Sequence, residues 1–181
     1  MLIIAHRGCT EGPDEKENEP NFIDEALKKF YCEIDLWKIQ DSLFLGHDYP
    51  KYKITENWLQ NRQKKLLVHC KNIAALSYIE NAQKEQYVRY HYFWHEEDKY
   101  TLTSQNIVLA YPGYSCPSGG IAMKCEHWPS IESGWFGICS DFVQSFDPDK
   151  DAQLGPYTKR LISLMDRYYL KQFGFSICKS E

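Results

Sequence analysis

Ionisable side chains lie at the carboxyl ends of several predicted strands of this chain, and four of them are histidines: His6, His47, His69 and His95. Arg7 directly follows the first, and Lys71 lies two residues after the third. Unpaired charges buried in an apolar core cost several kcal/mol each. Because reactive groups of parallel α/β folds gather at the carboxyl ends of strands, we expect these side chains to share one polar pocket.

This set of residue types is suited to in-line phosphoryl transfer. Histidine, with a pKa of about 6.5, can accept or donate a proton near neutral pH. One imidazole could take a proton from an attacking hydroxyl while another protonates the leaving oxygen. Arg7 could hold two phosphoryl oxygens at once, which Lys71 could not. Cations of this kind would stabilise charge that develops on the phosphoryl group.

Two carboxylates, Glu33 and Asp35, alternate along one predicted strand and therefore share one of its faces. Like charges side by side repel unless a cation lies between them, and carboxylate oxygens are typical ligands of Mg²⁺ or Ca²⁺. We expect one divalent metal ion here. The alternative for the pair is a solvated face of an edge strand, and the alternative for His69 is an ordinary core histidine.

The hydrophobic pattern predicts short strands that alternate with helices, which indicates an α/β fold with a parallel sheet. Residues 42–45 are predicted to pair back on the preceding strand as a hairpin, and residues 48–53 to form a loop. Pro20 is predicted to begin a helix. The other predicted helices span 56–63, 73–82 and 157–173, and the other strands 2–5, 31–37, 65–70, 90–95, 107–111, 121–124 and 137–142.

Composition excludes several classes of protein. The 181 residues carry 21 Lys and Arg against 25 Asp and Glu, without a basic stretch, so binding to duplex nucleic acid is not expected. No apolar run is long enough to span a bilayer. The amino terminus lacks the pattern of a signal peptide, and the seven cysteines show no CxxC spacing. We therefore expect a cytoplasmic protein with free thiols, and no particular oligomeric state is indicated.

Five short motifs occur in the order and spacing of the glycerophosphodiester phosphodiesterase family, which belongs to the phosphatidylinositol-specific phospholipase C-like superfamily. The chain resembles a short variant of this family over residues 1–141. The motifs are Ile4-Ala5-His6-Arg7-Gly8, Glu17-Asn18, Glu33-Ile34-Asp35-Leu36-Trp37, Gly46-His47-Asp48 and Gly137-Ile138-Cys139-Ser140-Asp141.

The resemblance implies a metal-dependent phosphodiesterase on a TIM barrel that cleaves glycerophosphodiesters to glycerol 3-phosphate and an alcohol. It implies that His6 and His47 are the general acid and base. Arg7 would bind the phosphate. Glu17, Glu33 and Asp35 match positions of the metal site.

The chain departs from the family where Glu-x-Lys is usual, because it carries His69-Cys70-Lys71. Lys71 matches and is expected to contact substrate. A histidine ligand lowers the negative charge of the site and could favour Mn²⁺ over Ca²⁺; alternatively, His69 does not bind the ion.

Three further residues, Trp94, His95 and Tyr111, are expected to form pocket walls or to contact substrate. For Trp94 and Tyr111, an ordinary place in the core is an equally good interpretation.

Length limits the barrel. We expect one domain over residues 1–181, with residues 150–181 forming a closing C-terminal helix. This leaves about 19 residues for each of eight units, against about 30 in a full barrel. We therefore expect a reduced TIM-like (β/α) barrel of seven parallel strands, with helices missing or vestigial in its second half, between residues 90 and 141.

Two rival functions stay open. One is a non-catalytic protein that captures a phosphorylated ligand in the same pocket. The other keeps the chemistry but acts on a lipid head group or a nucleotide.

Overall fold

The computed structural model describes residues 1–85, 88–128, 131–132 and 134–146. The expected closing helix over residues 150–181 lies outside the described residues. The α-helices are α1 (Pro20–Leu27), α2 (Glu56–Arg62) and α3 (Ile73–Glu85). The strands are β1 (Leu2–His6), β2 (Tyr31–Ile39), β3 (Ser42–Leu45), β4 (Tyr52–Ile54), β5 (Leu66–Cys70), β6 (His91–Phe93), β7 (Tyr100–Leu102), β8 (Val108–Ala110), β9 (Ile121–Met123) and β10 (Gly137–Ser140).

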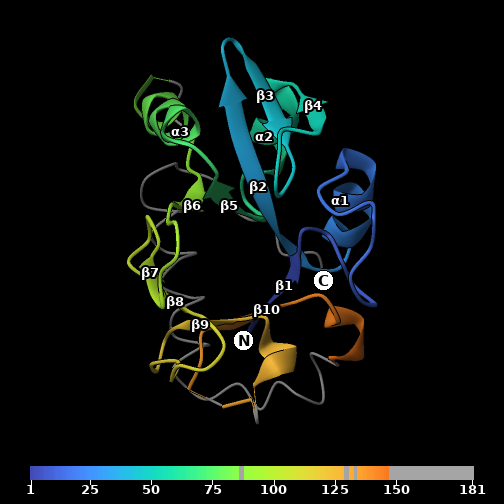
Figure 1. Ribbon diagram of the computed structural model, residues 1–181, viewed down its shortest axis with the longest axis vertical. Helices are drawn as coiled ribbons and strands as arrows, with labels where there is room; N and C mark the ends of the chain where they lie inside the picture. The colour runs from blue at the N-terminus through green and yellow to red at the C-terminus, as the bar shows by residue number, and fades with distance from the viewer. Residues whose placement is uncertain (86–87, 129–130, 133, 147–181) are drawn as a thin grey trace, which may run out of the picture.

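The strands form one mixed sheet that curls into a half-barrel (Figure 1). Parallel pairings join seven strands in the order β6-β5-β2-β1-β10-β9-β8. The hairpin strand β3 pairs antiparallel with the far end of β2, β4 with β3, and β7 with β8. The two ends of the curl meet near β6 and β7, where the backbone N–H of Ser104 donates to the carbonyl of Tyr92 at 2.8 Å.

Alternation along the strands builds two apolar layers. On β1, Ile3 and Ala5 belong to the layer between the sheet and the helices, whereas Ile4 belongs to the layer inside the curl. Helix α1 contributes Ile23 to the outer layer, because Ile23 and Ala26 lie on one helical face. Burial of a side chain such as Ile23 stabilises the fold by about 1.5–3 kcal/mol.

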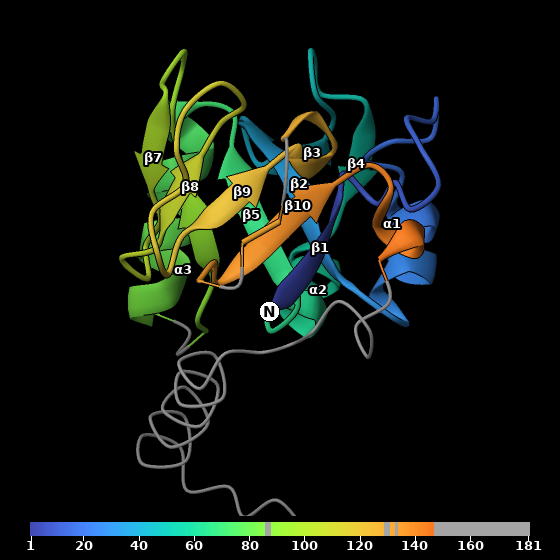
Figure 2. The same ribbon diagram turned by 90° about the horizontal axis from the view of Figure 1, so that it is seen from below.

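Capping residues define where two of the helices begin. Thr55 caps α2 by accepting from the backbone N–H of Trp58, and Asn72 caps α3 by accepting from that of Ala75. Figure 1 shows α1, α2 and α3 on the outside of the curled sheet, and Figure 2 shows the same elements from below. Among the described residues after α3, the connections contain only the 3-10 turns η1 (Cys125–His127) and η2 (Val143–Ser145).

The loop predicted over residues 48–53 is partly wrong, because β4 begins at Tyr52.

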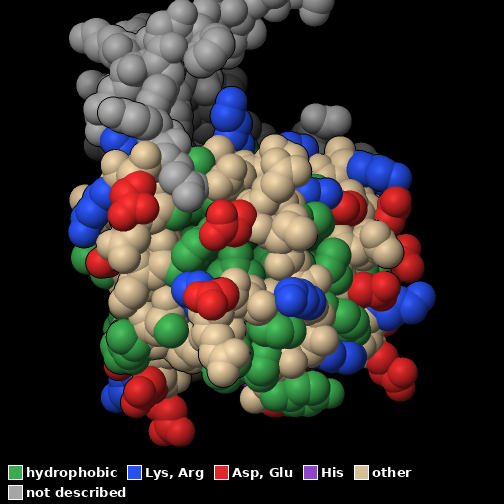
Figure 3. All heavy atoms as spheres, turned by 90° about the horizontal axis from the view of Figure 1, so that it is seen from above, with side chains coloured by type: hydrophobic (Ala, Val, Ile, Leu, Met, Phe, Trp, Pro, Cys, Tyr) green, Lys and Arg blue, Asp and Glu red, His purple; other side chains and the backbone are tan. Residues whose placement is uncertain are grey.

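The six described cysteines are unpaired and buried. No helix in the described ranges is both long and apolar enough to cross a membrane. The outer face in Figure 3 carries hydrophobic side chains among acidic and basic ones, and no described histidine is visible on it.

Candidate active site

A cavity of about 350 Å³ opens at the carboxyl ends of the parallel strands. Its lining includes eight residues expected from the sequence: His6, Arg7, Glu33, His47, His69, Lys71, His95 and Tyr111. Asp35 lies in contact with this lining, because it bonds to Arg7 and His69. Parallel pairing brings these residues together, since it places the ends of neighbouring strands at one edge of the sheet.

His6 is held by a carboxylate to which the sequence analysis assigned no catalytic, substrate or metal role. Its Nδ1 atom lies 2.7 Å from Oδ1 of Asp141, which directly follows β10, the parallel neighbour of β1. Burial raises the pKa of Asp141, but the hydrogen bond and charge of His6 outweigh burial and hold this pKa below its ordinary value.

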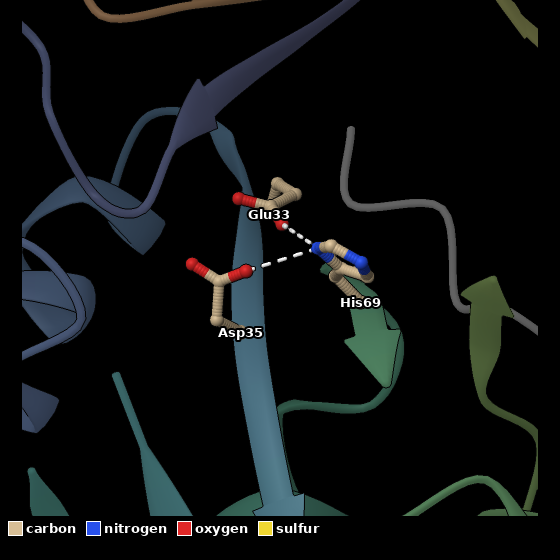
Figure 4. Close-up of side chains that lie close together, drawn as sticks. All are labelled: Glu33, Asp35 and His69. Carbon is tan, nitrogen blue, oxygen red and sulfur yellow. Dashed lines mark hydrogen bonds and ion pairs between the residues drawn. The ribbon is translucent and has the colours of Figure 1, made fainter. Parts of the chain in front are cut away.

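Three side chains could together hold a metal ion: Glu33 and Asp35 of β2 and His69 of β5 (Figure 4). Their candidate ligand atoms all lie within 4.8 Å of one another. Nδ1 of His69 lies 3.0 Å from Asp35 Oδ1 and 3.9 Å from Glu33 Oε1. The ring stacks with Phe93 and with His95, with centroids 4.6 and 4.8 Å away, and those two rings lie 5.7 Å from each other. The arrangement follows from the sheet register, which pairs Asp35 with His69 directly.

Asp35 is the most heavily bonded member of this cluster. Its Oδ2 accepts from Asn18 at 2.9 Å and lies 3.0 Å from Nε of Arg7, while Nζ of Lys71 lies 3.6 Å from Oδ1. Burial favours the neutral acid, but the hydrogen bond from His69 and the charges of Arg7 and Lys71 hold the pKa of Asp35 well below its usual range. Asp35 is therefore ionised at neutral pH.

Glu33 has the opposite environment. It is 1% exposed, and its Oε2 has no hydrogen-bond partner among the described residues. Burial, and then repulsion from Asp35, raise the pKa of Glu33 above its ordinary value. A buried oxygen without a partner destabilises the fold by about 1–3 kcal/mol. A cation at this cluster would remove that cost, so the residues fit a divalent ion.

His47 reaches the cavity from the turn after β3. Gly46 makes this turn possible: its φ is +150°, and a Cβ atom there would lie 2.2 Å from the carbonyl oxygen of Tyr49. The indole of Trp37 donates to the Gly46 carbonyl at 2.6 Å. Nδ1 of His47 lies 2.6 Å from Asp48, and burial, together with the charge of Arg7, lowers the pKa of the imidazole.

Two residues expected from the sequence lie elsewhere. Glu17 is outside the cluster of Glu33, Asp35 and His69, and its Oε2 accepts from Nη1 of Arg7 at 3.0 Å. Trp94 does not line the cavity; it is 39% exposed beside the acidic segment 96–98. Asn18 was missed as a site residue, although it bonds both the side chain and the backbone N–H of Asp35.

His95 and Tyr111 form a neutral pair across the ends of β6 and β8. The Tyr111 hydroxyl lies 2.9 Å from Nε2 of His95. Burial, followed by the charges of His69 and Lys71, lowers the pKa of His95 to about 4. Burial also raises the pKa of Tyr111. Both side chains are therefore uncharged at neutral pH.

Comparison with known proteins found no family model, no curated protein and no solved structure that matches this chain.

Proposed function

We propose that this chain is a metal-dependent phosphodiesterase on a reduced TIM-like barrel. It would cleave a glycerophosphodiester to glycerol 3-phosphate and an alcohol. The observation that carries the proposal is the convergence of His6, His47, Arg7, Lys71 and Glu33 on one cavity. Two imidazoles can serve as general acid and base, and the two cations can stabilise the charge that develops in in-line phosphoryl transfer.

The environments of the two histidines suggest different roles. Asp141 holds Nδ1 of His6, which leaves Nε2 as the atom that would give up a proton. His47 has a lowered pKa, so its neutral form is the abundant one near neutral pH and can act as base. His47 would take the proton of the glycerol hydroxyl as its oxygen bonds to phosphorus, and His6 would protonate the alcohol oxygen as its bond to phosphorus breaks. The product of this step would be a cyclic phosphate of glycerol. Water would then open this ring, with His6 acting as base and His47 as acid.

Arg7 and Lys71 would hold the phosphoryl oxygens. Glu17 and Asp35 orient the Arg7 guanidinium through contacts of 3.0 Å each. Glu33, Asp35 and His69 would bind one divalent ion, Mg²⁺, Ca²⁺ or Mn²⁺, which as a Lewis acid would stabilise charge on the phosphoryl group.

The test is an activity screen over glycerophosphocholine, glycerophosphoethanolamine, glycerophosphoinositol and bis(p-nitrophenyl) phosphate. Each substrate is assayed with Mg²⁺, Ca²⁺, Mn²⁺ and a chelator. The proposal requires turnover of at least one glycerophosphodiester that the chelator abolishes. The same panel distinguishes the head groups and so decides the substrate.

A second candidate is a non-catalytic protein that captures a phosphorylated ligand. One observation favours it: both carboxylate oxygens of Asp35 already have partners within the chain, Asn18 and Arg7 on one side and His69 and Lys71 on the other. Calorimetry with the same diesters would then detect binding without hydrolysis.

A further inference from the structure

One wall of the cavity takes no part in the proposed chemistry. This far wall consists of Met123 and Lys124 at the end of β9, Tyr111 after β8 and His95 after β6. Figure 1 shows β9 across the curl from β2, which carries Glu33. Strand β10 separates β9 from β1, so the ends of β1 and β9 lie two strand spacings apart, about 10 Å.

Lys124 has an unusual backbone for its residue type. Its φ is +48°, and Arg7, which also lines the cavity, has a φ of +54°. Each directly follows the last residue of a parallel strand. Residues other than glycine rarely adopt this left-handed backbone conformation. Where they do, the strained residue is often found at a functional site. The fold thus holds two cations at the same edge in the same strained conformation.

Lys124 also differs from the other two cations of the cavity in its partners. Arg7 pairs with Glu17 and Asp35, and Lys71 lies 3.6 Å from Asp35. Among the described residues, no carboxylate lies within 4.0 Å of the Lys124 ammonium. The positive charge of Lys124 contributes to the lowered pKa of Asp141, but the Asp141 carboxylate is bonded to His6.

No nearby group of the far wall balances Lys124. His95, Tyr111 and Met123 are residue types that supply no negative charge near neutral pH. Glu96 lies at the exposed rim, where water and salt screen its charge, whereas Lys124 is half-buried. The far wall therefore presents one positive charge on a neutral background.

We propose that Lys124 binds a second anionic group of the ligand, a carboxylate or a phosphate on the part of the molecule that faces β9. The inference rests on the proposed function only in that the first anionic group is a phosphoryl group held near Arg7 and Lys71. The favoured substrates are then phosphodiesters whose alcohol half is itself anionic, rather than those with a choline or ethanolamine half.

The test measures binding, so that it stands whether or not the chain turns over a diester. Isothermal titration in a buffer with MgCl₂ compares sn-glycerol 3-phosphate, which has one anionic group, with 3-phosphoglycerate, which adds a carboxylate. The unsubstituted chain is expected to bind 3-phosphoglycerate about tenfold more tightly, as one charged hydrogen bond would give. Lys124→Asn should abolish this difference and leave the affinity for glycerol 3-phosphate unchanged.

Asparagine is chosen because it tolerates the left-handed region, and circular dichroism checks that the variant folds. Lys124→Arg keeps the charge and should keep the preference. Lys29→Asn removes an exposed lysine after α1 and should also keep it. Equal affinity of the unsubstituted chain for the two ligands, no binding of either, or equal losses for both in Lys124→Asn would overturn the proposal. An absence of hydrolysis with this preference intact would count against the proposed function alone.

Discussion

Nδ1 of His6 and Oδ1 of Asp141 lie 2.7 Å apart, although 135 positions separate them in the chain. The contact exists because β1 and β10 pair in parallel, with Ala5 opposite Ser140, so that the next residues leave the sheet side by side. It fixes the orientation of the imidazole, because one ring nitrogen is bonded to a buried carboxylate.

Asp141→Asn should therefore impair catalysis more than binding. We expect kcat to fall about 100-fold, because His6 loses the carboxylate that orients its ring, while KM changes little. Steady-state kinetics measures both, and a loss confined to kcat distinguishes positioning of His6 from loss of substrate binding. Asp41→Asn, in the exposed hairpin turn, is the matched control. An unchanged kcat in folded Asp141→Asn would show that Asp141 has no role in positioning His6.

His69→Glu should change which metal ion the protein prefers. A third carboxylate adds negative charge and an oxygen ligand, which suits Mg²⁺ and Ca²⁺ better than an imidazole does. We expect the affinity for Ca²⁺ relative to Mn²⁺ to rise about tenfold, measured by calorimetry on the metal-free protein. His69→Gln, which adds no charge, should not produce this shift. Identical preferences in all three proteins would mean that His69 is not a ligand.

His91 should make the fold less stable in acid. Burial lowers its pKa to about 4, and its Nε2 has no partner in the described part of the chain. In the unfolded chain the ordinary value of about 6.5 applies. The unfolded state thus binds the extra proton first, and stability is lost as pH falls from about 6.5 toward 4.

This loss from His91 alone should reach about 2 kcal/mol between pH 7 and pH 5. Urea unfolding at the two pH values measures it. His91→Gln should reduce the pH dependence by that amount, whereas His127→Gln, at an exposed site, should not. An equal pH dependence in His91→Gln and the unsubstituted chain would contradict this assignment.

Gly46→Ala should displace His47. A Cβ atom would lie 2.2 Å from the Tyr49 carbonyl oxygen, so the turn would have to move. We expect a loss of at least about 2 kcal/mol in the free energy of unfolding and a lower kcat. Gly113→Ala is the control, since its φ is also positive but nothing lies within 4 Å of the added atom. Equal effects of the two substitutions would argue against the close contact at Gly46.

The sequence predicted those parts of the site that depend on local pattern. Alternation placed Glu33 and Asp35 on one face of β2, and the apolar runs placed His6 and Lys71 at strand ends. The local sequence pattern could not predict which strands are neighbours, because strand pairing is a property of the whole sheet. The contact of His6 with Asp141 and the stacking of His69 with Phe93 and His95 depend on that order.

Loop geometry was also beyond the sequence pattern. Glu17 was expected at the metal site, but the loop before α1 directs it to Arg7 and directs its neighbour Asn18 to Asp35. Trp94 follows β6 by one residue and so points to the opposite side from Phe93, which lines the cavity. Strand alternation alone could have excluded Trp94.

The most direct test of the proposed function is hydrolysis of the preferred glycerophosphodiester by His6→Ala and His47→Ala, with His127→Ala as the control. Both cavity variants should fold, as judged by circular dichroism, and should lose at least about 1,000-fold in kcat. His127→Ala should retain full activity. Full activity in either folded cavity variant would contradict the proposed function.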